Sequence, residues 1–281
     1  MSTRKTIKRI TQVAGWLALG AILLFILVSA MRQRAENTCR GYSIVMMGDV
    51  KDHFIDKAEV VQWIKQHGDW NLKGRKLESI NLRQMEEMLK KNDWISNAEL
   101  FVDNNRMVKV SVWQKRPVAR VFTMAGNSFY IDTACERLPV PVGKAVRVPV
   151  FTGFPLSKEN KVDKALLEQI KTISLYLEQD PLSQALVEQI DITAEREFEM
   201  VPAVGSFIVE LGDASDCKNK FERLGLFYKM VLSKVGFDYY ERVKVQYEKQ
   251  VVAVKREGKS NAMSSAPATA DVQQIIKSIS P

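Results

Sequence analysis

The sequence predicts an α+β protein with one N-terminal transmembrane helix, a small domain with the order β-α-α-β-β, and a mixed, β-rich domain with two or more helices. Three observations lead to this prediction. Residues 13–30 contain no charged side chain, alternating strand and helix patterns run from residue 42 to residue 256, and Ser, Ala and Pro dominate after Glu257.

The apolar stretch reads VAGWLALGAILLFILVSA. As a helix it would be roughly 27 Å long, close to the ~30 Å hydrocarbon core of a bilayer. We therefore predict a transmembrane helix over residues 13–31, after a cytoplasmic tail of residues 1–12. A cleaved signal peptide ending near Ala30 is the alternative, although its apolar core is usually about 7–15 residues long.

The flanking charges predict the orientation of this helix. Cytoplasmic flanks carry an excess of Lys and Arg. Two basic residues follow the stretch, with an acid close behind, whereas four basic residues and no acid precede it. The predicted topology-setting residues are Arg4, Lys5, Lys8 and Arg9. They place the N-terminus in the cytoplasm and the bulk of the chain outside it.

The net charge of the 281-residue chain is +8, which by itself is compatible with nucleic-acid binding. However, the first 34 residues hold six basic residues and no acid, which leaves 35 basic against 33 acidic residues in the remainder. A phosphate-binding surface needs concentrated positive charge, and no such run stands out. The sequence therefore predicts no nucleic-acid partner.

The first predicted domain covers residues 42–116, after a polar spacer at 32–41. Asp56 and Glu59 have the spacing of a capping box, Gly68 ends the helix that follows, and Asn81 begins a second helix. The predicted strands are 42–47, 98–102 and 107–114, the last two joined by a turn at 103–106. This order is similar to that of a POTRA domain, with both helices on one face of the sheet.

The second predicted domain covers residues 117–256. Pro117 suits a strand boundary, and a helix beginning at Asp163 and closed by Pro181 carries one apolar stripe. The stripe consists of Val162, Leu166, Ile170, Ile173 and Leu177. The other predicted elements are strands at 129–132, 149–153, 187–193, 197–201 and 206–211, a helix at 215–234 and a long strand at 241–256. Residues 257–281 are predicted to be disordered.

No catalytic or metal-binding constellation emerges from the residue pattern. The two histidines, His53 and His67, have no ligand set around them, and Asp132 with Glu136 reads as a solvated turn rather than a catalytic pair. Neither a G-x-S-x-G motif nor a phosphate-binding glycine loop occurs. We therefore predict no enzymatic activity, no cofactor, no metal and no small-molecule substrate.

The chain has three cysteines, which are Cys39, Cys135 and Cys217. So small and uneven a number does not indicate a disulfide framework. Cys135 and Cys217 could pair in an oxidising compartment, but the reading as small apolar residues is favoured.

The strand predicted at 241–256 is the last ordered element and therefore a candidate sheet edge. An edge strand presents unpaired backbone groups, to which a partner can add a strand. The predicted partner-binding residues are Val243, Val245, Tyr247, Glu248, Val251 and Val252. Alternatively, the charges of Lys244, Glu248, Lys249 and Lys255 blunt this edge against pairing.

Taken in order, these features resemble the FtsQ/DivIB family of bacterial cell-division proteins over residues 7–256. The resemblance rests on the anchor, the POTRA-like module, and the motifs KRPVAR at 115–120, YID at 130–132, LP at 138–139 and YEKQVV at 247–252. One departure is the turn at 133–136, which reads TACE where the family usually has a glycine.

The resemblance implies a non-enzymatic scaffold in the inner membrane at the division septum, with its bulk in the periplasm, linking early and late division proteins. It also implies partners resembling FtsB and FtsL, with a strand from FtsB added to the last strands of the second domain. Two alternatives remain: an envelope protein-assembly or polypeptide-transport factor, and a peptidoglycan enzyme for which no residues were found.

Overall fold

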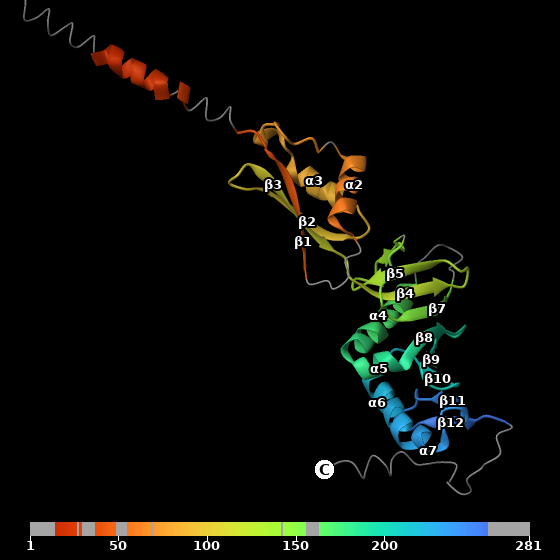
Figure 1. Cartoon of the computed structure of the whole chain (residues 1–281). Coiled ribbons are helices and arrows are strands. Elements are labelled where there is room, and N and C mark those ends of the chain that lie inside the picture. The colour runs from red at the N-terminus through yellow and green to blue at the C-terminus, as the bar shows by residue number, and fades with distance from the viewer. Residues whose placement is uncertain are drawn as a thin grey trace, which may run out of the picture. The chain divides into compact units, whose positions relative to one another are not determined.

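The structure is a computed structural model that describes residues 15–26, 28–29, 37–48, 55–68, 70–141, 143–155 and 163–257. The chain divides between Gln114 and Lys115 into two compact units (Figure 1). Each unit has its own sheet, of three strands in the first and nine in the second.

Ahead of the first sheet, residues 15–26 and 28–29 are helical. Among the residues that the structure describes, no helix is both long and apolar enough to cross a membrane. The predicted topology-setting residues Arg4, Lys5, Lys8 and Arg9 lie outside the described residues, and so does the tail after Glu257.

The first unit has the predicted order of elements. It consists of β1 (Gly41–Met47), α2 (Lys57–His67), the short 3-10 helix η1 (Leu77–Ser79), α3 (Leu82–Leu89), β2 (Ile95–Val102) and β3 (Met107–Gln114). The strands lie in the order β1-β3-β2, with β1 parallel and β2 antiparallel to β3. Both helices lie on the same side of this sheet (Figure 1). The β-α-α-β-β prediction is therefore confirmed.

Local hydrogen bonds explain where the two helices of the first unit begin. The Asp56 carboxylate accepts the Glu59 backbone N–H at 2.9 Å, and the Glu59 carboxylate accepts the Asp56 N–H at 2.8 Å. This is the predicted capping box, which satisfies backbone donors that the first turn leaves unpaired. The Asn81 side chain caps α3 in the same way, at 3.0 Å from the Gln84 nitrogen.

The second unit is a nine-stranded mixed sheet with helices against it. Its strands lie in the order β12-β11-β10-β9-β8-β7-β4-β5-β6. The strands are β4 (Pro117–Thr123), β5 (Ser128–Asp132), β6 (Arg137–Leu138), β7 (Val150–Phe154), β8 (Val187–Ile192), β9 (Phe198–Pro202), β10 (Ile208–Gly212), β11 (Tyr240–Lys244) and β12 (Val252–Lys255). The helices are α4 (Lys164–Gln179), α5 (Pro181–Leu186), α6 (Cys217–Phe227), the π-helical turn η2 (Tyr228–Leu232) and α7 (Ser233–Val235).

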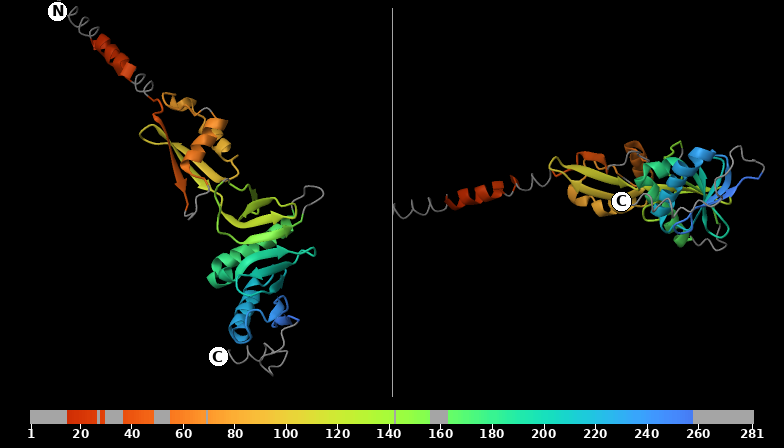
Figure 2. Two further views of the ribbon diagram at one scale, coloured as in Figure 1. Left: turned by 45° about the vertical axis from the view of Figure 1, so that its right-hand side comes forward. Right: turned by 90° about the horizontal axis from the view of Figure 1, so that it is seen from below.

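The core of the second unit lies between its sheet and its helices, and α4 and α6 share one side of the sheet (Figure 2). Leu166, Ile170, Ile173 and Leu177 on α4 are at most 1% exposed, which confirms the predicted stripe, while Val162 lies outside the described residues. They pack in one cluster with strand residues such as Phe151 and Phe198.

Two details of the predicted helices need correction. Pro181 does more than end α4, because it occupies the first turn of α5, where its missing N–H leaves no hydrogen bond unmade. The helix predicted at 215–234 begins at Cys217 and contains the π-helical turn η2.

The turn at 133–136 forms without the glycine that the resemblance led us to expect there. Cys135 takes the left-handed conformation, with φ 61°. The buried Asp132 carboxylate holds the turn by accepting the backbone N–H groups of Ala134 and Glu136 at 2.9 and 2.8 Å. Asp132 therefore has a structural role here. All three cysteines are free thiols.

A candidate partner-binding edge

The segment predicted as one strand over 241–256 is instead a hairpin. β11 and β12 are antiparallel neighbours, with Val243 opposite Ala253 and Lys244 opposite Val252. The chain turns around Lys249, which has φ 58°. The prediction of a single long strand was wrong because the apolar alternation continues on both sides of the polar turn, and no Gly or Pro marks the reversal.

This hairpin makes β11 an interior strand. β11 pairs with β10 in parallel on one side and with β12 on the other. Val243 and Val245 are fully buried in the core of the unit, and the Val245 N–H donates to the Glu210 carbonyl at 3.0 Å. The side chains of these two predicted site residues therefore belong to the core of the second unit and are not accessible to a partner.

The outer strand of the sheet is β12, and its solvent face is apolar. Val252 and Val254 are 39% and 42% exposed, and Tyr247 in the turn is 42% exposed. Alternate residues of a strand point to opposite faces, and Val251 and Ala253 accordingly pack against the core. Two exposed β-branched side chains on an edge strand are suited to pairing with another strand.

The backbone of β12 has donors available at this edge. The Arg256 N–H donates inward, to the Tyr239 carbonyl at 3.2 Å. Because successive N–H groups of a strand point to opposite sides, Lys255 and Ala253 direct theirs away from β11. Among the described residues, no strand pairs with this outer side of β12.

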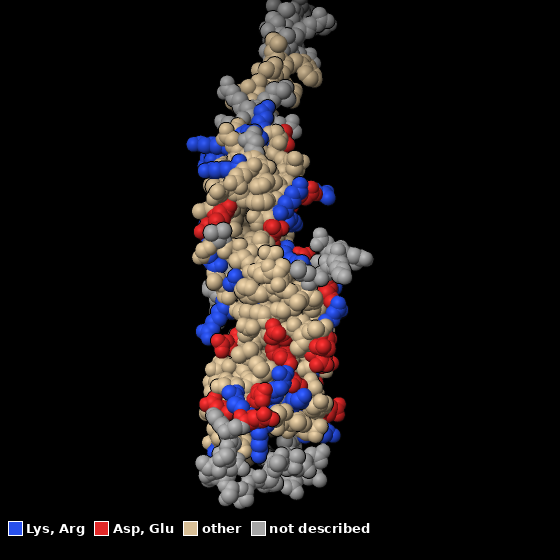
Figure 3. Space-filling model, turned by 90° about the vertical axis from the view of Figure 1, so that its right-hand side faces the viewer, with Lys and Arg blue, Asp and Glu red and all other residues tan. Residues whose placement is uncertain are grey.

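Charged residues next to the edge are engaged within the sheet. The Arg242 guanidinium bonds the carboxylates of Glu199 and Glu210, and the Lys244 ammonium lies 3.0 Å from Glu210. Burial opposes ionisation of Glu210, but the hydrogen bonds from Arg242 and Lys244 hold its pKa below the usual value. These ion pairs link the side chains of β9, β10 and β11. Acidic and basic side chains are interspersed on the face of the second unit seen in Figure 3.

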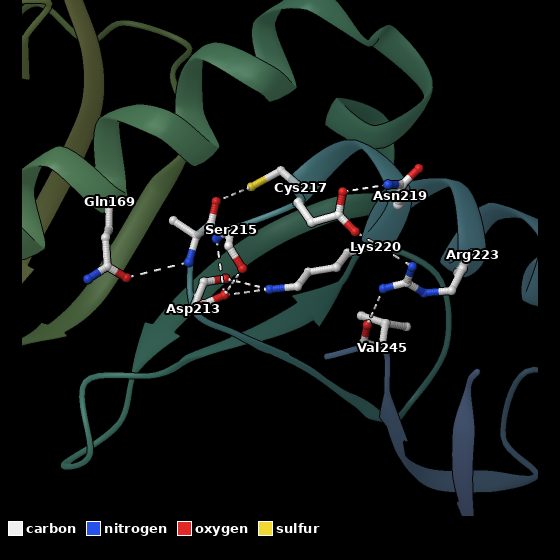
Figure 4. A network of polar contacts seen from close by, with 10 residues as sticks. Gln169, Asp213, Ser215, Cys217, Asn219, Lys220, Arg223 and Val245 are labelled. Atoms are coloured by element: carbon white, nitrogen blue, oxygen red, sulfur yellow. Dashed lines mark hydrogen bonds and ion pairs between the residues drawn. The ribbon is translucent and has the colours of Figure 1, made fainter. Parts of the chain in front are cut away.

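A second polar network joins the hairpin to α6 (Figure 4). Arg223, only 8% exposed, donates to the Val245 carbonyl at 2.8 Å, directly after β11. One helical turn before Arg223 on α6, the Lys220 ammonium donates to the Asp213 carboxylate at 2.8 Å and to the Asp213 backbone carbonyl at 2.9 Å. The Lys220 and Ser215 hydrogen bonds lower the pKa of Asp213 to about 2. These bonds connect the end of β10, the start of α6 and the end of β11.

The six predicted partner-binding residues therefore do not share one surface. Val252 lies on the exposed face of β12, Tyr247 and Glu248 lie in the exposed turn, and Val251 packs against the core. Their role in partner binding stays a prediction. Sequence reasoning missed Val254, which the β-strand alternation with Val252 would have indicated, and Arg223, which no sequence signal marks.

Comparison with known proteins matches both units. A family model described as "FtsQ/DivIB, C-terminal related" matches residues 116–254, and a POTRA-like domain model matches residues 37–113. The chain belongs to the FtsQ/DivIB family. A search of curated proteins finds no match.

The FtsQ/DivIB match extends from just before β4 almost to the end of β12. FtsQ/DivIB and POTRA domains generally belong to non-enzymatic scaffolds, and the family domains indicate a division-associated scaffold. All residues of β12 except Lys255 lie within the part of the chain that the FtsQ/DivIB model matches.

Proposed function

We propose that this protein is a bitopic scaffold of the bacterial divisome that binds a partner by strand addition along β12. The observation that supports it best is the edge itself. β12 ends the sheet, directs the N–H groups of Ala253 and Lys255 outward, and exposes Val252 and Val254. Each backbone bond to an added strand contributes roughly 0.5–1.5 kcal/mol net.

The family resemblance supplies the partner class, which is a division protein resembling FtsB, acting with one resembling FtsL. We further propose that residues 13–31 anchor the chain in the inner membrane, with the N-terminus in the cytoplasm and both units on the outer side. This arrangement places the edge where an exported partner segment can reach it.

The decisive experiment replaces Lys255 by proline in the full chain. Lys255→Pro removes an N–H that points away from the fold and puts a pyrrolidine ring in its place, so the sheet keeps its internal bonds. We expect co-purification of the FtsB-like protein to fall at least about tenfold, from the lost bond and the steric block.

The matched control is Lys255→Ala, which removes the charge and the contact of Lys255 with the Tyr239 ring but keeps the N–H. It should bind within about threefold of the parent, since exposed cation contacts contribute little. Equal binding by the proline variant, with an unchanged melting temperature, would show that β12 is not the docking strand.

Localisation separates the scaffold from an envelope assembly or transport factor. A fluorescent fusion should form a midcell band in dividing cells, and Lys255→Pro should reduce the recruitment of the partner to that band. A uniform peripheral signal at all stages of division would favour the assembly or transport function.

A further inference from the structure

Five basic side chains gather at the end of the first unit where the chain enters from its N-terminal segment. They are Arg40, Lys73, Arg75, Lys76 and Arg106, and together they are called the basic patch here. Three separate segments supply them: the approach to β1, the loop before η1, and the turn between β2 and β3. Figure 3 shows basic side chains gathered near this end of the first unit.

Backbone hydrogen bonds hold these segments together. The Cys39 N–H donates to the Arg75 carbonyl at 2.8 Å, and the Gly74 N–H returns a bond to the Cys39 carbonyl at 2.8 Å. Thr38 and Lys76 form an antiparallel bridge. The Arg40 N–H donates to the Arg106 carbonyl at 2.9 Å, which brings the β2–β3 turn alongside. Cys39 is buried beneath them, at 1% exposure.

The patch concentrates positive charge in a unit that is otherwise balanced. Residues 37–114 contain 12 basic and 11 acidic residues, so five of the 12 cations lie at one end. Arg40, Lys73, Arg75 and Lys76 are exposed, and Arg106 is half-buried. Asp103, the acid of the adjacent turn, already faces Lys109 at 3.8 Å. Glu78 follows Lys76 by two residues, so this end carries five basic side chains against the two neighbouring acids Asp103 and Glu78, an excess of positive charge.

The position of the patch along the chain indicates what it faces. Only six residues separate Ala30, at the end of the apolar stretch, from Asn37, the first residue that the structure describes ahead of β1. Such a segment spans at most roughly 25 Å. If residues 13–31 cross the bilayer, the chain leaves the membrane within roughly 25 Å of the start of the first unit, at the end where the patch lies. Near a membrane surface that carries anionic lipid, each Lys or Arg raises the affinity for that surface about fivefold.

We propose that the basic patch binds the headgroups of anionic phospholipids in the outer leaflet of the membrane that holds the anchor. This inference rests on the proposed anchoring of residues 13–31. The contact would orient the first unit at the membrane surface. Its position would then be set by the lipid contact as well as by the segment that joins it to the anchor. Lys73, Arg75 and Lys76, which lie within four residues, would supply most of the contact.

The test uses the full chain reconstituted into vesicles, with hydrogen–deuterium exchange as the readout. One set of vesicles contains phosphatidylcholine alone, and the other also contains phosphatidylglycerol. Amide exchange at residues 72–77 and 105–107 should be at least about fivefold slower with phosphatidylglycerol. High salt should remove the difference, since the Debye length falls to about 3 Å at 1 M.

The test variant is Lys73→Gln, Arg75→Gln and Lys76→Gln combined, and it should lose the lipid dependence. Its matched control removes two cations at the opposite end of the same unit, as Lys90→Gln with Lys91→Gln, and should keep it. Equal exchange rates in both lipids for the parent chain would overturn the proposal, as would an equal loss of protection in the control variant.

Failure of the anchor would be visible separately, as extraction of the chain from the vesicles by alkaline carbonate. In that case the patch is judged by flotation at low salt. Weaker flotation of the triple variant than of the Lys90/Lys91 control with phosphatidylglycerol vesicles would support the lipid site. Equal flotation of the two variants would refute it.

Discussion

At the scale of single residues, the ion pair of Lys220 with Asp213 has a consequence that depends on pH. Lys220 is 4% exposed, and its hydrogen bond is the main cause of the lowered Asp213 pKa of about 2. A carboxyl whose pKa is lower in the folded state stabilises the fold above its unfolded pKa of 3.8, and this contribution disappears as the pH falls toward 2. Because the Asp213 side chain is 65% exposed, solvent screening limits the effect to about 1 kcal/mol.

Asp213→Asn should therefore lower the free energy of unfolding of the second unit by about 1 kcal/mol at pH 6. The parent and the variant should converge between pH 4 and pH 2. Urea unfolding of both proteins, followed by far-ultraviolet circular dichroism across this pH range, measures the difference in the free energy of unfolding. A difference that stays constant down to pH 2 would contradict a role for the Asp213 charge.

At the scale of elements, α6 holds the C-terminal hairpin through Arg223. Arg223→Met keeps the length of the side chain but leaves the Val245 carbonyl without its donor. An unsatisfied buried acceptor costs about 1–3 kcal/mol. We expect amide exchange across β11 and β12 to accelerate about five- to 150-fold, if local opening of the hairpin carries this cost.

The comparison for this prediction is Lys218→Met, an exposed cation on the same helix whose distance from Glu222 is 3.9 Å. It should leave exchange in the hairpin unchanged. If amide exchange accelerates equally throughout the second unit in Arg223→Met, the substitution destabilises the whole unit. That result would contradict a specific role of Arg223 in holding the hairpin.

At the scale of the whole molecule, each of the two units has a core of its own. Ile64 on α2 and Ile170 on α4 are both fully buried, each within a different unit. Replacing a buried Ile by Ala typically costs about 2–5 kcal/mol. In calorimetry of the full chain, Ile64→Ala should lower one unfolding transition and Ile170→Ala the other. One transition that both variants shift equally would show that the units unfold as a single cooperative body.

Local signals predicted most of the elements. The capping box at Asp56, the Asn81 cap and the α4 stripe were correct because caps and helical faces depend on residues within one or two turns. The turn at 103–106 was correct for the same reason. The hairpin turn at Lys249 was missed because a left-handed Lys has no sequence signature, unlike a glycine in that conformation.

The sequence alone therefore determined the β-α-α-β-β order of the first unit, the mixed α/β character of the second, and the family. Tertiary structure decided which strand forms the edge, because strand order depends on pairings between distant segments that no local pattern encodes. The exposed valines near this edge are Val252 and Val254, whereas the predicted Val243 and Val245 are buried. The tertiary structure also brought Arg40 and Arg106 next to the Lys73–Lys76 loop through backbone bonds. The cluster K-G-R-K at 73–76 was visible in the sequence, but its two distant neighbours became part of one patch only when the chain folded.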